Sequence, residues 1–195
     1  MDQAKPTWLA LGDSYTIGES VDMEARWPHQ LTHRLGYADP TYLATTGWTT
    51  LDLQQAIEQT TFNPPYDWVS LLIGVNDQYQ GLDIANYPRE FEQLLDFAIS
   101  QATTRPQVLV LSIPDYSVTP YAQRHDPEKI AAEIARYNEI NQEISLEKGV
   151  QYCDITPLSL LAAEDLSLLA EDELHPSGKM YRLWVDKILY EIPFP

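Results

Sequence analysis

The feature of this sequence that most constrains its fold is the nearly unbroken apolar run at residues 67–73, Asp-Trp-Val-Ser-Leu-Leu-Ile. A strand that is apolar at almost every position has both faces covered, which is typical of a parallel sheet between two layers of helices. The polar turn that begins at Gly74 marks the end of this strand. The run therefore predicts the central strand of a parallel sheet.

Four other short apolar runs predict the remaining strands, at residues 8–11, 40–44, 107–113 and 150–154. Helical patterns separate them: residues 26–35, a segment capped by Thr49 or Thr50 and broken by Pro64-Pro65, one opened by Pro88, one from Asp126 to Gly149, and one capped by Ser177. Strands that alternate with helices predict an α/β fold, a three-layer α/β/α sandwich with a mainly parallel five-stranded sheet. We expect one domain over residues 1–195.

Polar residues with catalytic potential follow several of these strands. Open α/β sheets bind ligands beyond the carboxyl ends of their strands, and Ser14, Gly47 and Asn76 would lie there. Asp172 and His175 follow the fifth strand, and Ser, Asp, His is one chain order that builds a hydrolytic triad. Each residue also has a plain structural interpretation, because Asp, Ser and Asn cap helices and glycine forms turns.

In four separate blocks the sequence resembles the SGNH, or GDSL-type, esterases and lipases. The matching blocks are Gly12-Asp13-Ser14, Gly47, Gly74-Val75-Asn76-Asp77 and Asp172-Glu173-Leu174-His175-Pro176. The correspondence spans residues 9–176, and it implies the flavodoxin-like fold of that family. Tyr15-Thr16 departs from the leucine that the family often has after its serine, a change that affects the shape of the pocket more than its chemistry.

The resemblance implies a catalytic role for each matching residue. Ser14 would attack an acyl carbonyl, His175 would accept and return the proton, and Asp172 would orient the imidazole. The oxyanion hole would consist of the backbone N–H groups of Ser14 and Gly47 and the side-chain amide of Asn76. Asp13 is expected to form structural hydrogen bonds within the loop. These roles predict a serine ester hydrolase that cleaves a small carboxylic ester through an acyl-enzyme.

Three aromatic residues in loops near the expected site, Trp48, Tyr79 and Tyr116, are candidates for substrate binding, although packing explains them equally well. Tyr121 is a fourth such aromatic residue. Family members act on acetylated sugars, short-chain esters, thioesters and lysophospholipids, so a lysophospholipase or thioesterase is an alternative. A non-hydrolytic binding module on the same fold is another.

Composition excludes several classes of partner. With 29 acidic and 12 basic residues the net charge is −17, which disfavours nucleic acids and anionic surfaces. No apolar run is long enough to span a membrane, and the N-terminus lacks the pattern of a signal peptide, so we expect a cytoplasmic protein with a small-molecule ester as its partner. Cys153 alone cannot form an internal disulfide, and His29 and His33 lack the glutamate of a zinc motif. We therefore expect no metal and no other cofactor.

Overall fold

The computed structural model describes residues 4–194 and contains a five-stranded sheet in the order β2-β1-β3-β4-β5. Every pair of neighbouring strands is parallel. This confirms the α/β class and the parallel sheet predicted from the sequence. The strands are β1 (Trp8–Gly12), β2 (Thr41–Ala44), β3 (Trp68–Leu72), β4 (Val108–Leu111) and β5 (Gln151–Cys153).

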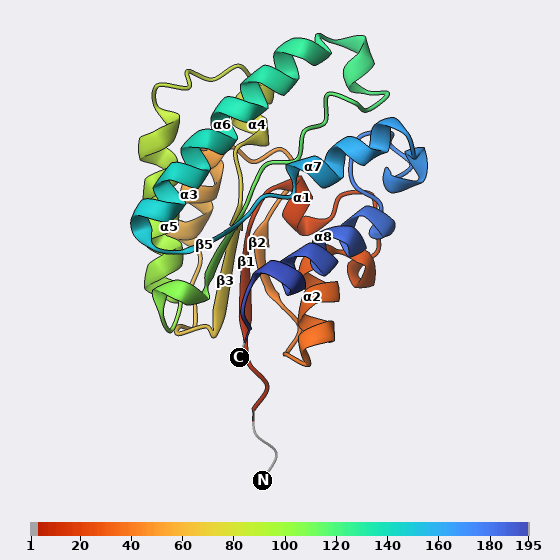
Figure 1. The fold of residues 1–195 in the computed structure, drawn as a ribbon. Helices are drawn as coiled ribbons and strands as arrows, with labels where there is room; N and C mark the ends of the chain where they lie inside the picture. Colours follow the sequence, from red (N-terminus) through yellow and green to blue (C-terminus); the bar gives the residue numbers. More distant parts are fainter. Residues whose placement is uncertain (1–3, 195) are drawn as a thin grey trace.

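Helices cover both faces of this sheet (Figure 1). One layer contains α2 (Trp27–Leu35) and α8 (Gly178–Glu191), which pack against each other. The opposite layer contains α3 (Thr50–Gln59), α5 (Tyr87–Gln101) and α6 (Pro127–Lys148), with α5 in contact with both of its neighbours. Three short helices complete the set of α-helices among the described residues: α1 (Ser14–Ile17), α4 (Val75–Tyr79) and α7 (Thr156–Ser159).

The core lies on both faces of the central strands. All five residues of β1 and all five of β3 are buried, as the apolar run at residues 67–73 predicts. The rings of Trp8 and Trp68 stack at 5.6 Å between centroids where β1 and β3 pair. Full burial of one large apolar side chain contributes about 1.5–3 kcal/mol, so the central strands are a major source of stability.

The predicted caps are present, and the segment ends differ in places. Thr49 caps α3 in a reciprocal capping box with Asp52, and Asp126 accepts a hydrogen bond from the Lys129 backbone at the start of α6. The helix α3 ends at Gln59 and not at Pro64-Pro65, because Thr60 is already extended and donates its hydroxyl to the Ala56 carbonyl.

The fourth strand and the segment after it also depart from the prediction. β4 ends at Leu111 and does not reach residue 113, because the Ile113 backbone N–H bonds to the Asn138 side chain of α6 instead of a neighbouring strand. The loop at residues 115–125 contains a 3₁₀ turn at Ala122–Arg124. Local side-chain competition for backbone groups thus sets these boundaries.

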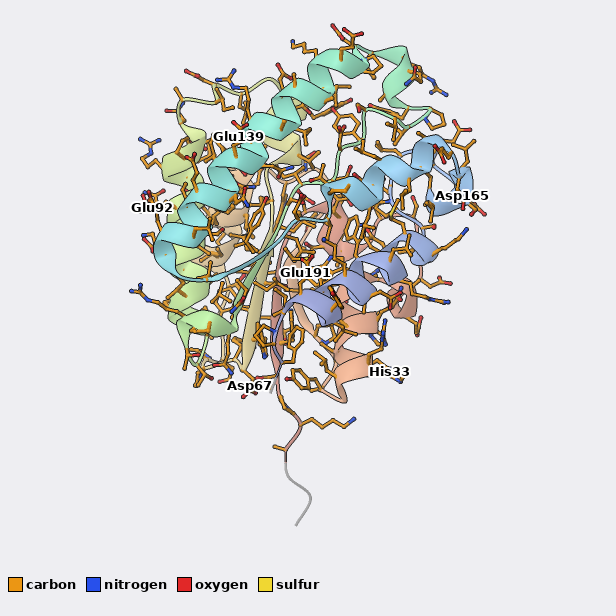
Figure 2. The ribbon with its side chains drawn as sticks, viewed as in Figure 1. His33, Asp67, Glu92, Glu139, Asp165 and Glu191 are labelled. Atoms are coloured by element: carbon orange, nitrogen blue, oxygen red, sulfur yellow. The ribbon has the colours of Figure 1, made fainter. Side chains whose placement is uncertain are left out.

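Charged side chains lie mainly outside this framework. Figure 2 shows Glu92 on α5 and Glu139 on α6, and both side chains are exposed. Among the described residues, no helix has the length and apolar character that a bilayer crossing requires.

Candidate active site

A pocket of about 160 Å³ opens at the carboxyl ends of the strands. It collects residues from five segments of the chain that are far apart in sequence. The residues that line it are Ser14, Tyr15, Thr46, Gly47, Val75, Asn76, Tyr79, Tyr116, Tyr121, Leu174 and His175. Four of the five predicted triad and oxyanion-hole residues therefore line one pocket, and Asp172 contacts it through His175.

Ser14 is placed by a tight turn between β1 and α1. Asp13 is the N-cap of α1, and its Oδ1 accepts a hydrogen bond of 3.0 Å from the Tyr15 backbone N–H. Ser14 is therefore the first residue of a helix, 4% exposed. Gly12 makes the turn possible, because a Cβ there would lie 2.3 Å from both the Leu72 carbonyl oxygen and the Thr16 hydroxyl. The lack of a side chain at Gly12 and the cap at Asp13 together place Ser14 at the start of α1.

Asp13 itself is fully buried, and burial raises the pKa of its carboxyl group to about 8. Its contact with the Tyr15 backbone is the structural hydrogen bond that the sequence analysis expects. Asp13 is not among the described residues that line the pocket. Asp13 therefore supports the turn that positions Ser14.

His175 is oriented by Asp172. The distance from His175 Nδ1 to Asp172 Oδ2 is 2.7 Å, and Asp172 Oδ1 accepts hydrogen bonds from the backbone N–H groups of Leu174 and His175. The Ser20 hydroxyl donates to Asp172 Oδ2 at 2.7 Å. Partial burial opposes ionisation of Asp172, but these hydrogen bonds outweigh it and lower the pKa of the carboxyl group to about 2.

An ionised Asp172 determines the tautomer of the ring. A carboxylate only accepts hydrogen bonds, so the proton of a neutral His175 lies on Nδ1. Nε2 then carries a free lone pair, and the imidazole lies in the wall of the pocket that contains Ser14. This arrangement can accept a proton at Nε2 and stabilise the resulting cation through Asp172.

The segment that carries Asp172 and His175 is irregular but closed on itself. The Ala170 backbone N–H donates to the His175 carbonyl oxygen at 2.7 Å, and Leu169 and Pro176 form an antiparallel bridge. Glu173 has a φ of 60°, a left-handed conformation that lets the chain reverse direction between the two residues. Backbone contacts thus hold the imidazole in place.

Asn76 and Gly47 also line the pocket. Asn76 lies in the first turn of α4, and its Nδ2 donates a hydrogen bond of 2.9 Å to the Trp48 carbonyl oxygen. An amide NH₂ has two hydrogens, so one remains for a bound oxygen atom. Gly47 has a φ of 87°, and no atom lies within 4 Å of the position of a Cβ.

The aromatic candidates differ in position. Tyr79, Tyr116 and Tyr121 line the pocket, and the Tyr79 and Tyr121 hydroxyl oxygens are 2.6 Å apart. Trp48 is not among the described residues that line it. The side chain of Trp48 packs against the core, and only its carbonyl oxygen contributes, through Asn76.

The remaining candidates lie elsewhere. His33 is exposed and points away from the sheet at the end of α2 (Figure 2). Within residues 4–194 no group of three or more His, Cys, Asp or Glu side chains is arranged to hold a metal ion. Burial and the nearby Glu191 carboxylate raise the pKa of the buried Cys153 thiol to about 12, which makes it a poor nucleophile.

Sequence reasoning missed several residues that line the pocket, and it missed Ser20, which contacts Asp172. Ser20 is 152 positions from Asp172, and no local pattern indicates that its hydroxyl bonds to that carboxylate. Thr46 and Leu174 are neighbours of Gly47 and His175, and Val75 precedes Asn76. Thr46, Leu174 and Val75 could have been predicted as pocket residues from their position next to a predicted site residue.

The sequence matches the family model described as GDSL-like lipase/acylhydrolase over residues 10–183. No curated protein sequence gives a significant match. Several solved structures are similar over nearly the whole chain.

A member of the lipolytic protein G-D-S-L family from Veillonella parvula is similar at a TM-score of 0.78 and 19% identity, covering 95% of this chain and 97% of that one. An acetylxylan esterase from Geobacillus stearothermophilus gives 0.70 and 20% identity, covering 100% and 98%. TesA gives 0.73 and 16% identity, covering 94% and 96%. At these identities the structures show a shared fold.

Proposed function

The chain belongs to the GDSL-like lipase/acylhydrolase family of carboxylic ester hydrolases, and on that premise we propose that Ser14, His175 and Asp172 hydrolyse a small ester through an acyl-enzyme. The observation that carries this proposal is the pocket wall shared by Ser14 and His175, with His175 bound at Nδ1 to an ionised carboxylate. A serine hydroxyl is a weak nucleophile without such a base.

The reaction follows from this arrangement in two halves. His175 Nε2 takes the Ser14 hydroxyl proton as Oγ attacks the acyl carbon, and then returns that proton to the leaving alcohol oxygen. In the second half, His175 takes a proton from water, the hydroxide attacks the acyl carbon, and the Ser14 oxygen leaves with the proton. Asp172 stabilises the imidazolium in both halves and keeps the ring oriented.

The oxyanion of each tetrahedral intermediate needs donors that are already in place. In the proposal these are the backbone N–H groups of Ser14 and Gly47 and the free N–H of Asn76. The hydrogen bond from Asn76 to the Trp48 carbonyl supports this role, because it fixes the amide before substrate binds. Ser14 is also the first residue of α1, where backbone N–H groups have no partner within the helix.

The size and lining of the pocket favour a short, uncharged acyl group. Its volume of about 160 Å³ is below the roughly 300–1,000 Å³ of pockets that hold drug-sized ligands. Tyr79, Tyr116 and Val75 supply apolar surface. The net charge of −17 disfavours anionic substrates. An acetyl or similar short-chain ester is the substrate class we propose.

Covalent labelling tests the mechanism. A fluorophosphonate probe is expected to modify Ser14, identified by peptide mass spectrometry, and to abolish hydrolysis of p-nitrophenyl acetate. Ser14→Ala should remove both the label and the activity. Ser100→Ala is the matched control, because it removes an exposed serine of α5 and leaves the proposed nucleophile and its partners in place. Folded protein that resists the probe and hydrolyses no p-nitrophenyl ester would identify a binding module instead.

A further inference from the structure

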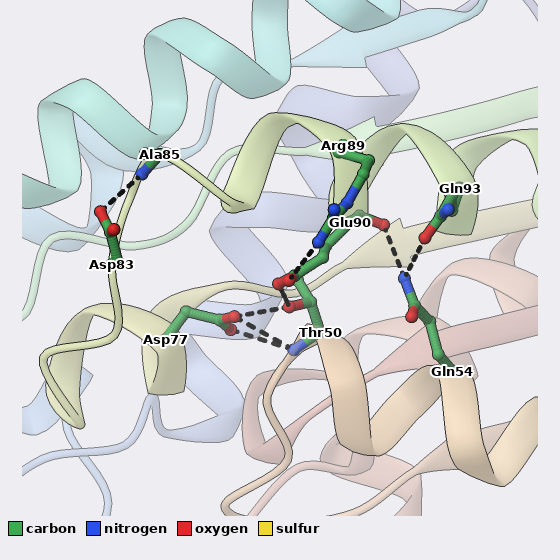
Figure 3. Close-up of polar contacts among 8 residues, drawn as sticks. All are labelled: Thr50, Gln54, Asp77, Asp83, Ala85, Arg89, Glu90 and Gln93. Atoms are coloured by element: carbon green, nitrogen blue, oxygen red, sulfur yellow. Dashed lines mark hydrogen bonds and ion pairs between the residues drawn. The ribbon is translucent and has the colours of Figure 1, made fainter.

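A buried cluster of polar side chains lies beside the pocket, where three helices meet (Figure 3). Asp77 of α4 is 2% exposed, Glu90 of α5 is 7% exposed and Thr50 of α3 is fully buried. The Thr50 hydroxyl oxygen lies 2.6 Å from Asp77 Oδ1 and 2.9 Å from Glu90 Oε2. The Thr50 backbone N–H is 3.1 Å from Asp77 Oδ2. One hydroxyl thus joins two carboxyl groups.

A count of hydrogens constrains the charge of this cluster. A hydroxyl has one hydrogen and donates it to one acceptor, yet two carboxyl oxygens lie within hydrogen-bond distance of Thr50 Oγ1. If both carboxyl groups were ionised, one contact would be an oxygen–oxygen pair without a proton. Such a contact between buried groups is costly. A proton on one of the two carboxyl groups, in addition to the hydroxyl hydrogen, removes this unfavourable contact. The protonated acid then donates to the Thr50 hydroxyl oxygen, and Thr50 donates to the other carboxylate.

Little positive charge is available to replace that proton. Arg89 Nη2 lies 3.5 Å from Glu90 Oε1, but the arginine is mostly exposed. The titratable groups of the described residues whose charges interact with Asp77 are acids or phenols. They are Asp13, which follows β1, Tyr87 and Glu90 of α5, and Tyr137 of α6. Another acid, Asp83, interacts with Tyr137. Burial is the largest effect on Asp77 and, with the charge of Glu90, raises the pKa of its carboxyl group to about 6.

The cluster joins the two segments that form the proposed oxyanion hole. Thr50 is the first residue of α3 and follows directly on the turn that contains Gly47 and Trp48. Asp77 follows Asn76 in α4. The bonds between Thr50 and Asp77 and the bond from Asn76 to the Trp48 carbonyl therefore hold the same pair of segments together at two adjacent points.

We propose that Asp77 and Glu90 share one proton through the Thr50 hydroxyl, and that these positioning residues hold the turn at Gly47 and Trp48 against Asn76. The shared proton rests on the geometry of the cluster alone. Its effect on turnover rests, in addition, on the proposed function. Loss of the proton leaves two buried anions at one hydroxyl and loosens the contact between α3 and α4.

The substitution Asp77→Asn tests the shared proton. The amide oxygen can accept from the Thr50 backbone N–H and the NH₂ can donate to Thr50 Oγ1, so asparagine reproduces the protonated acid at every pH. The melting temperature of the variant is expected to exceed that of the wild type by a margin that grows as pH rises from about 4 to about 6. An ordinary ionised acceptor at position 77 gives the opposite result, because its loss costs most above pH 6.

A double-mutant cycle separates proton sharing from simple burial of a charge. With Glu90→Gln in the background, the amide can donate to Thr50, and Thr50 can donate to an ionised Asp77. Asp77→Asn should then give little or no further rise in melting temperature at pH 7. Equal stabilisation in both backgrounds would overturn the proposal, since burial alone predicts it. Asp83→Asn is the matched control, an acid that accepts only from the Ala85 backbone and should show no such pH dependence.

Kinetics on p-nitrophenyl acetate test the positioning role. Thr50→Val removes the hydroxyl with little change of shape and should lower kcat about tenfold with KM nearly unchanged, because the donors move while the pocket remains. Thr50→Ser should restore kcat. The ratio of Asp77→Asn to wild-type kcat should rise with pH. Unchanged kcat in Thr50→Val overturns the positioning role, whereas a wild type without esterase activity overturns the proposed function and leaves the stability test valid.

Discussion

The pocket has a charged side, formed by His175 with Asp172 bonded to it, and a neutral side, formed by Asn76 with Asp77 next to it in the chain. The environments of the two carboxyl groups shift their pKa values in opposite directions. Asp172 receives hydrogen bonds from four donors in a loop near solvent, which lower the pKa of its carboxyl group to about 2. Asp77 is buried next to Glu90, and burial raises the pKa of its carboxyl group to about 6. One side therefore maintains a charge, and the other side disfavours one.

The two sides also differ in what holds them. The loop with Asp172 and His175 is closed mainly by its own backbone contacts. From far along the chain the Ser20 hydroxyl bonds to Asp172, and Tyr121 and Arg124 contact Glu173 at the edge of the loop. The oxyanion side depends on side chains from three helices that meet at Thr50. Asp172 and His175 are therefore held mainly by contacts within their own loop. Asn76 and Gly47, the proposed neutral donors, are held by the packing of helices that are distant in sequence.

The largest expected effect comes from neutralising the charged side. Asp172→Asn keeps the shape but removes the charge that stabilises the imidazolium, and it can place the histidine proton on the wrong nitrogen. The corresponding change in a serine protease costs about 10⁴-fold in kcat. We expect about 10³-fold here, measured on p-nitrophenyl acetate, because the carboxylate lies nearer to solvent.

Glu173→Gln is the matched control for that substitution. Glu173 is adjacent to Asp172, but its side chain is exposed and pairs with Arg124 at 3.6 Å. Its replacement should leave kcat close to the wild-type value. Equal losses in the two variants would mean that bulk negative charge supports His175, and the specific role of Asp172 would be abandoned.

The next largest effect tests the neutral side. Asn76→Ala removes the proposed side-chain donor and also frees the Trp48 carbonyl, so kcat should fall about 10²-fold while KM changes little. Steady-state kinetics measure the two parameters separately. A raised KM with unchanged kcat would instead place Asn76 in substrate binding.

The acid stability of the protein tests the charged side in the absence of any substrate. The carboxyl group of Asp172 has a pKa of about 2 in the folded state and 3.8 ordinarily, so it stabilises the fold above pH 3.8 and loses this contribution as pH falls toward 2. The difference in free energy of unfolding between wild type and Asp172→Asn should therefore shrink over that range, as measured by urea titration. A difference that is constant with pH would show that its hydrogen bonds do not depend on the charge.

The smallest effect is expected at the ion pair between Arg124 and Glu173. Both side chains are more than half exposed, and such pairs contribute about 0–1 kcal/mol. Arg124→Ala should leave the melting temperature and kcat nearly unchanged. A clear fall in kcat would contradict local support of the His175 loop, because the loop would then depend on a surface contact with the 3₁₀ turn that precedes α6.

Periodicity was enough to predict the five strands and most helix starts, because burial on both faces and capping residues leave local patterns such as residues 67–73 and Thr49. The four matching blocks likewise indicated four residues that line the pocket: Ser14, Gly47, Asn76 and His175. The contacts that support them could not be predicted. Ser20 meets Asp172 across 152 positions, and the cluster at Thr50 requires knowing how α3, α4 and α5 approach one another. Trp48 was predicted as a substrate-binding side chain, but its side chain packs against the core and its carbonyl oxygen accepts a hydrogen bond from Asn76. The sequence could not indicate this division of roles.

Gly12, at the end of β1, and Gly47, in the wall of the pocket, are both glycines, but for different physical reasons. At Gly12 there is no room for a methyl group, whereas at Gly47 the space is empty and the obstacle is the positive φ of 87°. That backbone conformation is strained for an L-residue but natural for its mirror image. A D-alanine introduced by chemical ligation would therefore fit at position 47 and rigidify the turn. At this position the fold requires a particular handedness, and glycine is the only genetically encoded residue that has none.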